Sequence, residues 1–136
     1  MDLKKPGAQE EEDLVNLKFP SDLKDAKFLL NSEVAILLEH RKDIDSAEGI
    51  EFPQTFHKTL AYAEKFSRFK TKASIKQVRA TLSKHQLAEY EIACLANLCV
   101  ETSDEAKSLI PSLKRVKDDD ALQSYLDDLA NLRKFN

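Results

Sequence analysis

Turn-forming residues are scarce in this sequence: its 136 residues include two glycines, four prolines and no tryptophan. A fold with many strands needs many tight turns, which glycine and proline favour, so the composition disfavours an all-β architecture. No run approaches the ~18 apolar residues of a membrane-spanning helix, and the N-terminus lacks the apolar segment of a signal peptide. We therefore expect an intracellular protein that does not contact a membrane.

Signals for catalysis and for metal binding are also missing. Cys94 and Cys99 are five residues apart, which fits neither a CxxC redox pair nor a zinc site, so we expect two reduced thiols in the core. The three histidines lie in polar stretches, and no G-x-S-x-G or H-E-x-x-H motif is present. The adjacent Asp127 and Asp128 would point about 100° apart on a helix, which hinders a shared metal or proton. We predict no catalytic residue, no metal site and no cofactor.

What the sequence does contain is the length of one domain, 33% charged residues and an uneven charge distribution. Acids concentrate in 9–13 and 118–120, whereas 65–84 carries only basic charges. A solvated face is the simpler interpretation, and a contact with nucleic acid or an acidic partner is the alternative. The candidate basic contact patch consists of Lys65, Arg68, Lys70, Lys72, Lys76, Arg79 and Lys84.

The N-terminal part reads as an acidic arm followed by short extended pieces. Residues 1–15 are charged and nearly featureless, and we expect them to be disordered. In 17–19 and 28–30, apolar side chains alternate as in a strand, but each piece is too short to form a sheet. Their backbone groups would be satisfied by pairing with another chain, so we assign 16–52 as a partner-binding segment.

The rest of the chain shows helical periodicity. Within the partner-binding segment, Ser32 is the expected N-cap of a helix over 33–42; one continuous helix over 22–42 is the alternative, which the poor helix formers Asn31 and Ser32 disfavour. The patterns further predict an aromatic core helix over 53–69, a helix that Ser74 and Gln77 cap, and a buried central helix over 87–99. They also predict a Thr102-capped short helix before Pro111 and a last helix over 119–134. The expected fold class is all-α, with a bundle of short helices over 70–136.

Several strings also occur in the order and spacing of a known family. They are LLNSEV (29–34), LLEHRK (37–42), FSRFK (66–70), EIACLANLC (91–99), EAKSLIPSL (105–113) and LDDL (126–129). The chain thereby resembles the fourth subunit of eukaryotic RNA polymerase II over about Leu14–Phe135. One departure is Val100, where the family usually has proline; it leaves Thr102 to hold the corner after the central helix.

The resemblance implies a non-catalytic subunit of RNA polymerase II that pairs with the seventh subunit to form the stalk. It implies an HRDC-like helical bundle, action in initiation and on the emerging transcript, RNA contact through the complex, and location in the nucleus, with the cytoplasm as a second compartment. The predicted partner-interface residues are Leu17, Phe19, Phe28, Leu29, Leu30, Val34, Leu37 and Leu38. The alternatives are the equivalent stalk subunit of RNA polymerase III or of a plant-specific polymerase, and a free nucleic-acid-binding HRDC-like module.

Overall fold

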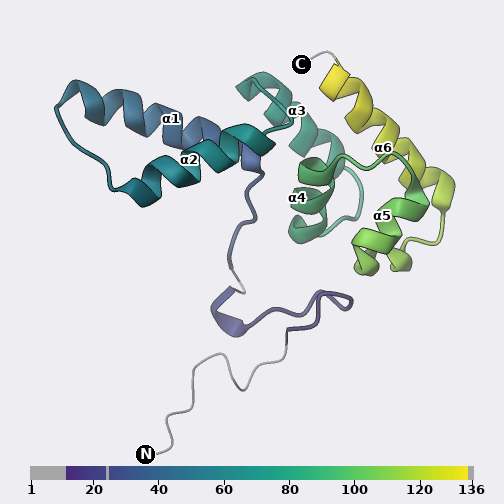
Figure 1. The fold of residues 1–136 in the computed structure, drawn as a ribbon. Coiled ribbons are helices and arrows are strands. Elements are labelled where there is room, and N and C mark those ends of the chain that lie inside the picture. Colours follow the sequence, from purple (N-terminus) through teal and green to yellow (C-terminus); the bar gives the residue numbers. More distant parts are fainter. Residues whose placement is uncertain (1–11, 24, 135–136) are drawn as a thin grey trace, which may run out of the picture.

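The computed structural model describes residues 12–23 and 25–134, and every regular element in these ranges is helical (Figure 1). The predicted disordered arm over 1–15 therefore lies largely outside the described residues. The prediction of an all-α fold is confirmed. The elements are η1 Ser21–Leu23, α1 Asn31–Ala47, α2 Gln54–Phe66, α3 Lys72–Ser83, α4 Glu89–Leu98, α5 Ser103–Leu109, η2 Pro111–Arg115 and α6 Asp119–Lys134.

The helices form two connected parts. In Figure 1, α1 and α2 lie side by side as a hairpin that projects from the bundle of α3 to α6. Within the bundle, α6 packs against α3 and α5, and α3 also contacts α4 and α1. Leu30, before α1, and Phe69, after α2, are fully buried in the bundle core, so both ends of the hairpin are anchored there.

Helix α1 begins earlier and ends later than the sequence predicts. Ser32 is not the N-cap: it lies inside the first turn, and the Glu33 carboxylate accepts a hydrogen bond from Leu30 N at 2.8 Å instead. The helix continues five residues beyond 42, to Ala47. Gly49, with φ of 78°, then turns the chain, a conformation that glycine adopts without strain.

The prediction of an aromatic core helix is wrong in its aromatic part. Helix α2 buries Leu60 and Ala63, whereas Tyr62 and Phe66 are 60% and 37% exposed. Phe69 is buried, but it follows the helix. The buried side chains of α2 are thus a leucine and an alanine, and the rings of Tyr62 and Phe66 lie at the surface.

Helices α3, α4 and α6 lie where the sequence predicts them, and each buries apolar side chains. The cap of α3 lies three residues before the predicted one, since Thr71 Oγ1 accepts from Ser74 N at 3.0 Å. Helix α4 is the predicted central helix. Helix α6 has the predicted bounds. The buried residues of α4 and α6 are Glu91, Ile92, Ala93, Leu95, Ala96, Leu122, Leu126 and Leu129.

The corner between α4 and α5 is held on both sides. Cys99 adopts the left-handed conformation (φ 49°) that ends α4, and its N–H donates to Leu95 O at 2.9 Å. Thr102 Oγ1 accepts from Glu105 N at 3.2 Å, as predicted for the cap of α5. Val100, between them, is buried in the core, so packing fixes the corner where the family usually has proline.

Candidate partner-binding surface

The first strand-like piece forms a turn within this chain. Asp13 and Lys18 exchange two backbone hydrogen bonds of 3.0 and 2.8 Å, and Leu17 lies in the turn with φ of 56°. A left-handed residue interrupts a strand. The prediction that 17–19 is an open strand awaiting a partner is therefore wrong.

An aromatic cluster then fastens the N-terminal segment to the bundle. The rings of Phe19 and Phe28 are 5.3 Å apart, and both contact Tyr90 of α4, at 5.6 and 6.2 Å. Arg79 Nη2 also donates to Phe28 O at 2.6 Å. Phe19 and Phe28 thus pack against their own chain, and each remains half-buried.

The eight predicted partner-interface residues differ widely in exposure. Leu30 is fully buried in the bundle core, which leaves no surface of it for a partner. Leu29 and Leu37 are 44% and 57% exposed. The other five are half-buried: Leu17, Phe19, Phe28, Val34 and Leu38.

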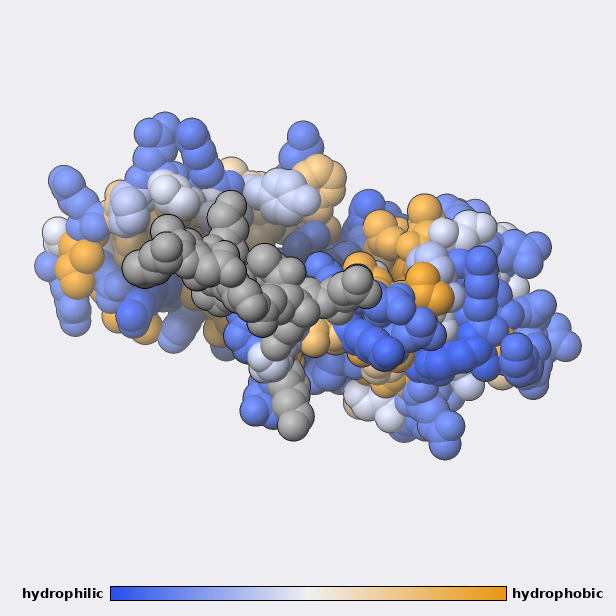
Figure 2. All heavy atoms as spheres, turned by 90° about the horizontal axis from the view of Figure 1, so that it is seen from below, coloured by the Kyte–Doolittle hydropathy of each residue, from blue (hydrophilic) through white to orange (hydrophobic). Residues whose placement is uncertain are grey.

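A groove between α1 and α3 contains both exposed leucines. It has a volume of about 270 Å³ and is bounded by apolar side chains from both helices and by two lysines of α3. We call it the α1–α3 groove; its residues are Leu29, Glu33, Ile36, Leu37, Lys72, Ile75 and Lys76. Exposed apolar side chains that gather on one surface are typical of protein-binding sites. In Figure 2 most of the visible face is hydrophilic, with separate hydrophobic patches over the hairpin and over the bundle.

Neither Ile36 nor Ile75 is among the predicted partner-interface residues, although both line the groove. Ile36 belongs to α1, and Ile75 belongs to α3. Their meeting depends on how α1 crosses α3, for which the sequence offers no local signal.

One ion-pair network lies beside the groove and fixes its shape. Arg79 binds both carboxylate oxygens of Glu33 at 2.7 Å, and its Nη1 donates to Glu89 Oε2 at 2.9 Å. Burial opposes ionisation of Glu33, but the hydrogen bonds from Arg79 and from Leu30 N lower the pKa of its carboxyl below the ordinary value. The hydrogen bonds to Glu33 and, to a smaller degree, to Glu89 raise the pKa of Arg79 although burial opposes this. The carboxylate and the guanidinium are therefore a charged pair at neutral pH.

The residues of the predicted basic contact patch differ in their surroundings. Arg79 is held in its ion pairs, and Arg68 Nε donates to Asn97 O at 3.3 Å. Lys72 and Lys76 border the α1–α3 groove, whereas Lys84 lines a separate cavity. Lys65 lies over the ring of Phe66, at 5.5 Å from its centroid, and Lys70 Nζ donates to Ser67 O.

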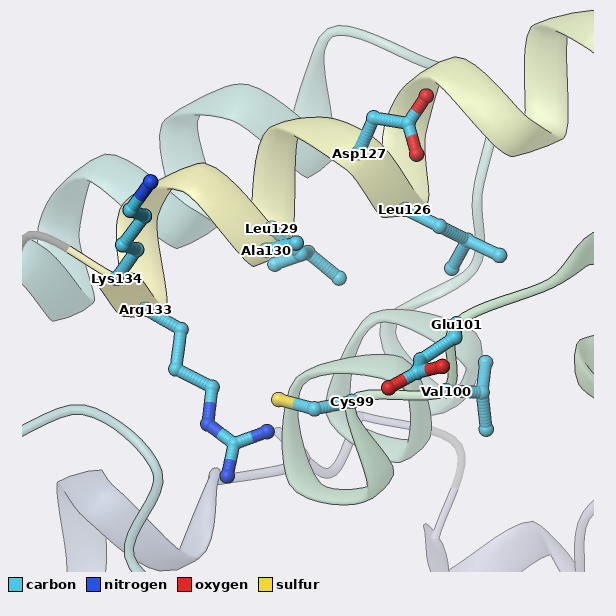
Figure 3. A pocket seen from close by; sticks show the side chains of 9 residues that line it. All are labelled: Cys99, Val100, Glu101, Leu126, Asp127, Leu129, Ala130, Arg133 and Lys134. Atoms are coloured by element: carbon cyan, nitrogen blue, oxygen red, sulfur yellow. The ribbon is translucent and has the colours of Figure 1, made fainter.

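Another cavity, between α6 and the α4–α5 corner, has a volume of about 470 Å³ (Figure 3). The Arg133 side chain extends toward Cys99 across it, whereas Asp127 lies farther along α6. Burial raises the pKa of the Cys99 thiol despite this cation, and Sγ lies 3.3 Å from Ala96 O as its donor. The thiol is thus protonated at neutral pH, so the cavity does not present an activated nucleophile.

No group of three or more His, Cys, Asp or Glu side chains in 12–23 and 25–134 is arranged to hold a metal ion. No helix within these ranges is long and apolar enough to cross a membrane.

Comparison with known proteins assigns the family. The family model described as RNA polymerase Rpb4 matches residues 28–133, which include α1 to α6 almost entirely. The chain belongs to the RNA polymerase Rpb4 family. This match spans both the hairpin and the bundle, so the α1–α3 groove lies within the Rpb4 region.

The similar proteins carry consistent names. DNA-directed RNA polymerase II subunit rpb4 of Dictyostelium discoideum is 67% identical, over 98% of this chain and 97% of that protein. DNA-directed RNA polymerase II subunit 4 of Arabidopsis thaliana is 40% identical, over 93% and 97%. The subunit rpb4 of Schizosaccharomyces pombe is 36% identical, over 96% and 98%. The resemblance to the fourth subunit of RNA polymerase II, inferred from the sequence, is confirmed.

Proposed function

We propose that this Rpb4-family chain is a non-catalytic subunit of nuclear RNA polymerase II, and that it forms the stalk with the polymerase's seventh subunit. Through the stalk it acts in initiation and in handling the emerging transcript. The observation that carries the assignment to polymerase II is the 67% identity, over almost the whole chain, to a protein named as a subunit of that enzyme. A chain so similar along its whole length is expected to assemble in the same way.

The contact with the seventh subunit is assigned to the α1–α3 groove and the exposed leucines beside it. Leu29 and Leu37 offer apolar surface without contributing to the bundle core, so a partner can bury them while the fold stays unchanged. Lys72 and Lys76 on the same surface favour a partner segment with acidic residues next to its apolar ones. Phe19 and Phe28 act indirectly, by holding Leu29 in place.

A double substitution tests the surface. Leu29→Asp with Leu37→Asp places two carboxylates in a desolvated contact, where an unpaired charge costs several kcal/mol, so we expect binding of the purified seventh subunit to weaken by about a hundredfold or more. The matched control is Leu109→Asp on α5, since Leu109 is 53% exposed and does not border the groove. Calorimetric titration of each variant gives the affinity, and thermal unfolding verifies that the fold is retained.

Tight binding by the double variant would show that the seventh subunit contacts another surface. The polymerase assignment has its own test: a tagged chain is expressed in cells and the co-purifying large subunits are identified by mass spectrometry. We expect those of RNA polymerase II. Recovery of the large subunits of RNA polymerase III instead would overturn the assignment.

A further inference from the structure

A separate cavity of about 340 Å³ lies where the α3–α4 connection meets η2 and α6. Its residues come from three distant stretches of the sequence: Lys84, His85, Gln86, Leu87, Arg115, Val116 and Tyr125. The proposed stalk contact uses none of them. The rings of His85 and Tyr125 stack at 3.5 Å with 18° between their planes, which fixes one wall of the cavity.

The charged side chains that line this cavity are all basic. Lys84 and Arg115 carry positive charges and His85 supplies an imidazole, and among the described residues no carboxylate lines the cavity. Lys84 also lies at the C-terminal end of α3, where a cation is favourable by itself, whereas Arg115 comes to the same cavity from η2. Three such donors around a small cavity suit a compact anion.

Hydrogen bonds within the protein fix the position of the Arg115 guanidinium. One of its terminal nitrogens, Nη2, bonds the buried Glu91 carboxylate and donates to Gln86 O at 3.0 Å. Glu91 is fully buried and is also bound by Ser112 Oγ at 2.6 Å and by Ala88 N at 2.8 Å. The guanidinium is therefore anchored on one side, while its Nε and Nη1 have no hydrogen-bond partner among the described residues. An anchored guanidinium loses little conformational entropy when it binds an oxyanion.

We propose that this cavity binds the phosphate group of a phosphorylated serine or threonine in a partner protein. Arg115 and Lys84 bind the phosphate oxygens, and His85 donates one further hydrogen bond. Leu87, Val116 and the ring of Tyr125 provide apolar surface for the residue next to the phosphorylated one.

The surrounding charges favour a single phosphate over a nucleic-acid strand. A strand needs a track of cations along its backbone. Residues 118–120, which begin two residues after the cavity residue Val116, are instead all acidic. These carboxylates disfavour a long polyanion more than a single phosphate group, because each further phosphate adds to the repulsion.

The test uses the full chain labelled with ¹⁵N and a capped alanine peptide that contains one phosphoserine. We expect saturable shifts of the amide signals of 84–87, 115 and 125, with a dissociation constant on the order of 1 mM for so small a ligand. The unphosphorylated peptide is expected to leave these signals unchanged. Lys84→Gln should weaken binding about fivefold, because it removes one charge-assisted hydrogen bond that is partly exposed to water.

The matched control is Lys117→Gln, which removes the same charge nearby but outside the cavity, and which should change the affinity by less than about twofold. Arg115 is left intact, since its removal would leave the buried Glu91 without its cation. The proposal is overturned if no saturation occurs by about 10 mM peptide. It is also overturned if the two lysine variants lose equal affinity, or if single-stranded RNA of 12 nucleotides shifts the same signals at lower concentration.

Discussion

Replacing Arg79 by methionine should destabilise the protein and loosen the hairpin of α1 and α2. The substitution keeps most of the apolar stem but removes the bidentate bond to Glu33, the bond to Glu89 and the bond to Phe28 O. Hydrogen bonds to charged groups contribute about 1.5–3 kcal/mol each when well formed, and less when water competes. Since the Arg79 side chain is 25% exposed, we expect a total loss of about 2–3 kcal/mol in the free energy of unfolding, or roughly 10 °C in Tm.

A double-mutant cycle divides this loss between the two carboxylates. Glu33 is bound at two oxygens and its side chain is 18% exposed, whereas Glu89 is bound at one oxygen and is 47% exposed. We therefore expect a coupling energy of about 1.5 kcal/mol between Arg79 and Glu33, against at most about 0.5 kcal/mol between Arg79 and Glu89. Urea unfolding of Arg79→Met, Glu33→Gln, Glu89→Gln and the two double variants supplies all the terms.

The same pair gives the prediction a pH dependence. Because the folded-state pKa of Glu33 is lowered from 4.5, its stabilising effect is fully present above about pH 4.5. It is lost as the pH falls through the lower folded-state pKa. The difference in stability between wild type and Arg79→Met should therefore narrow below pH 4.5. An equal or larger coupling to Glu89, or a difference that does not change with acidification, would refute this account.

Two further predictions concern buried groups. Ser32→Ala should lower the free energy of unfolding in urea by about 1–3 kcal/mol, because the Ser32 hydroxyl accepts hydrogen bonds from Arg68 N and Phe69 N, both at 3.1 Å. The control Ser124→Ala, at an exposed position, should lower it by less than about 0.5 kcal/mol. Equal losses in the two variants would contradict the role assigned to Ser32. Burial raises the pKa of the Cys94 and Cys99 thiols. Alkylation by iodoacetamide at pH 7.5 should therefore be slower in the folded protein than in urea, and it should accelerate as the pH rises. Rapid alkylation of the folded protein would show that burial does not control the reactivity of these thiols.

The sequence predicted the bundle well because its helices are specified locally. Helix α6 has a leucine stripe, acids in its first turn and bases in its last, and these signals agree with one another. Helix α4 is apolar on two faces, which indicates burial whatever surrounds it. The cap by Thr102 is likewise a contact over three residues. Signals of this range can be read without knowing the tertiary structure.

The N-terminal segment was predicted less well because its partners are distant in the sequence. The alternating apolar side chains in 17–19 and 28–30 indicate extended backbone. They do not show whether these side chains contact another chain or Tyr90 of the same chain. Serine near a helix start suggests a local cap, whereas Ser32 binds backbone groups 36 and 37 residues away. Arg79 seemed part of a solvated basic run because its main acid, Glu33, is 46 residues away.

These distant contacts share one location, the first turn of α1. Asn31 N donates to Asn97 Oδ1 of α4 at 2.8 Å. The Ser32 hydroxyl accepts a hydrogen bond from the backbone that follows α2, and the Glu33 carboxylate accepts one from Arg79 of α3. Each of three consecutive residues thus joins α1 to a different part of the molecule. The orientation of the hairpin depends on this turn together with Leu30 and Phe69 in the bundle core, whereas the packing of its two helices depends on Leu60, Ala63 and the facing side of α1. Substitutions in the turn should therefore displace the α1 side of the α1–α3 groove relative to α3, while the helix content stays the same. The stability of this turn is thus linked directly to the proposed contact with the seventh subunit.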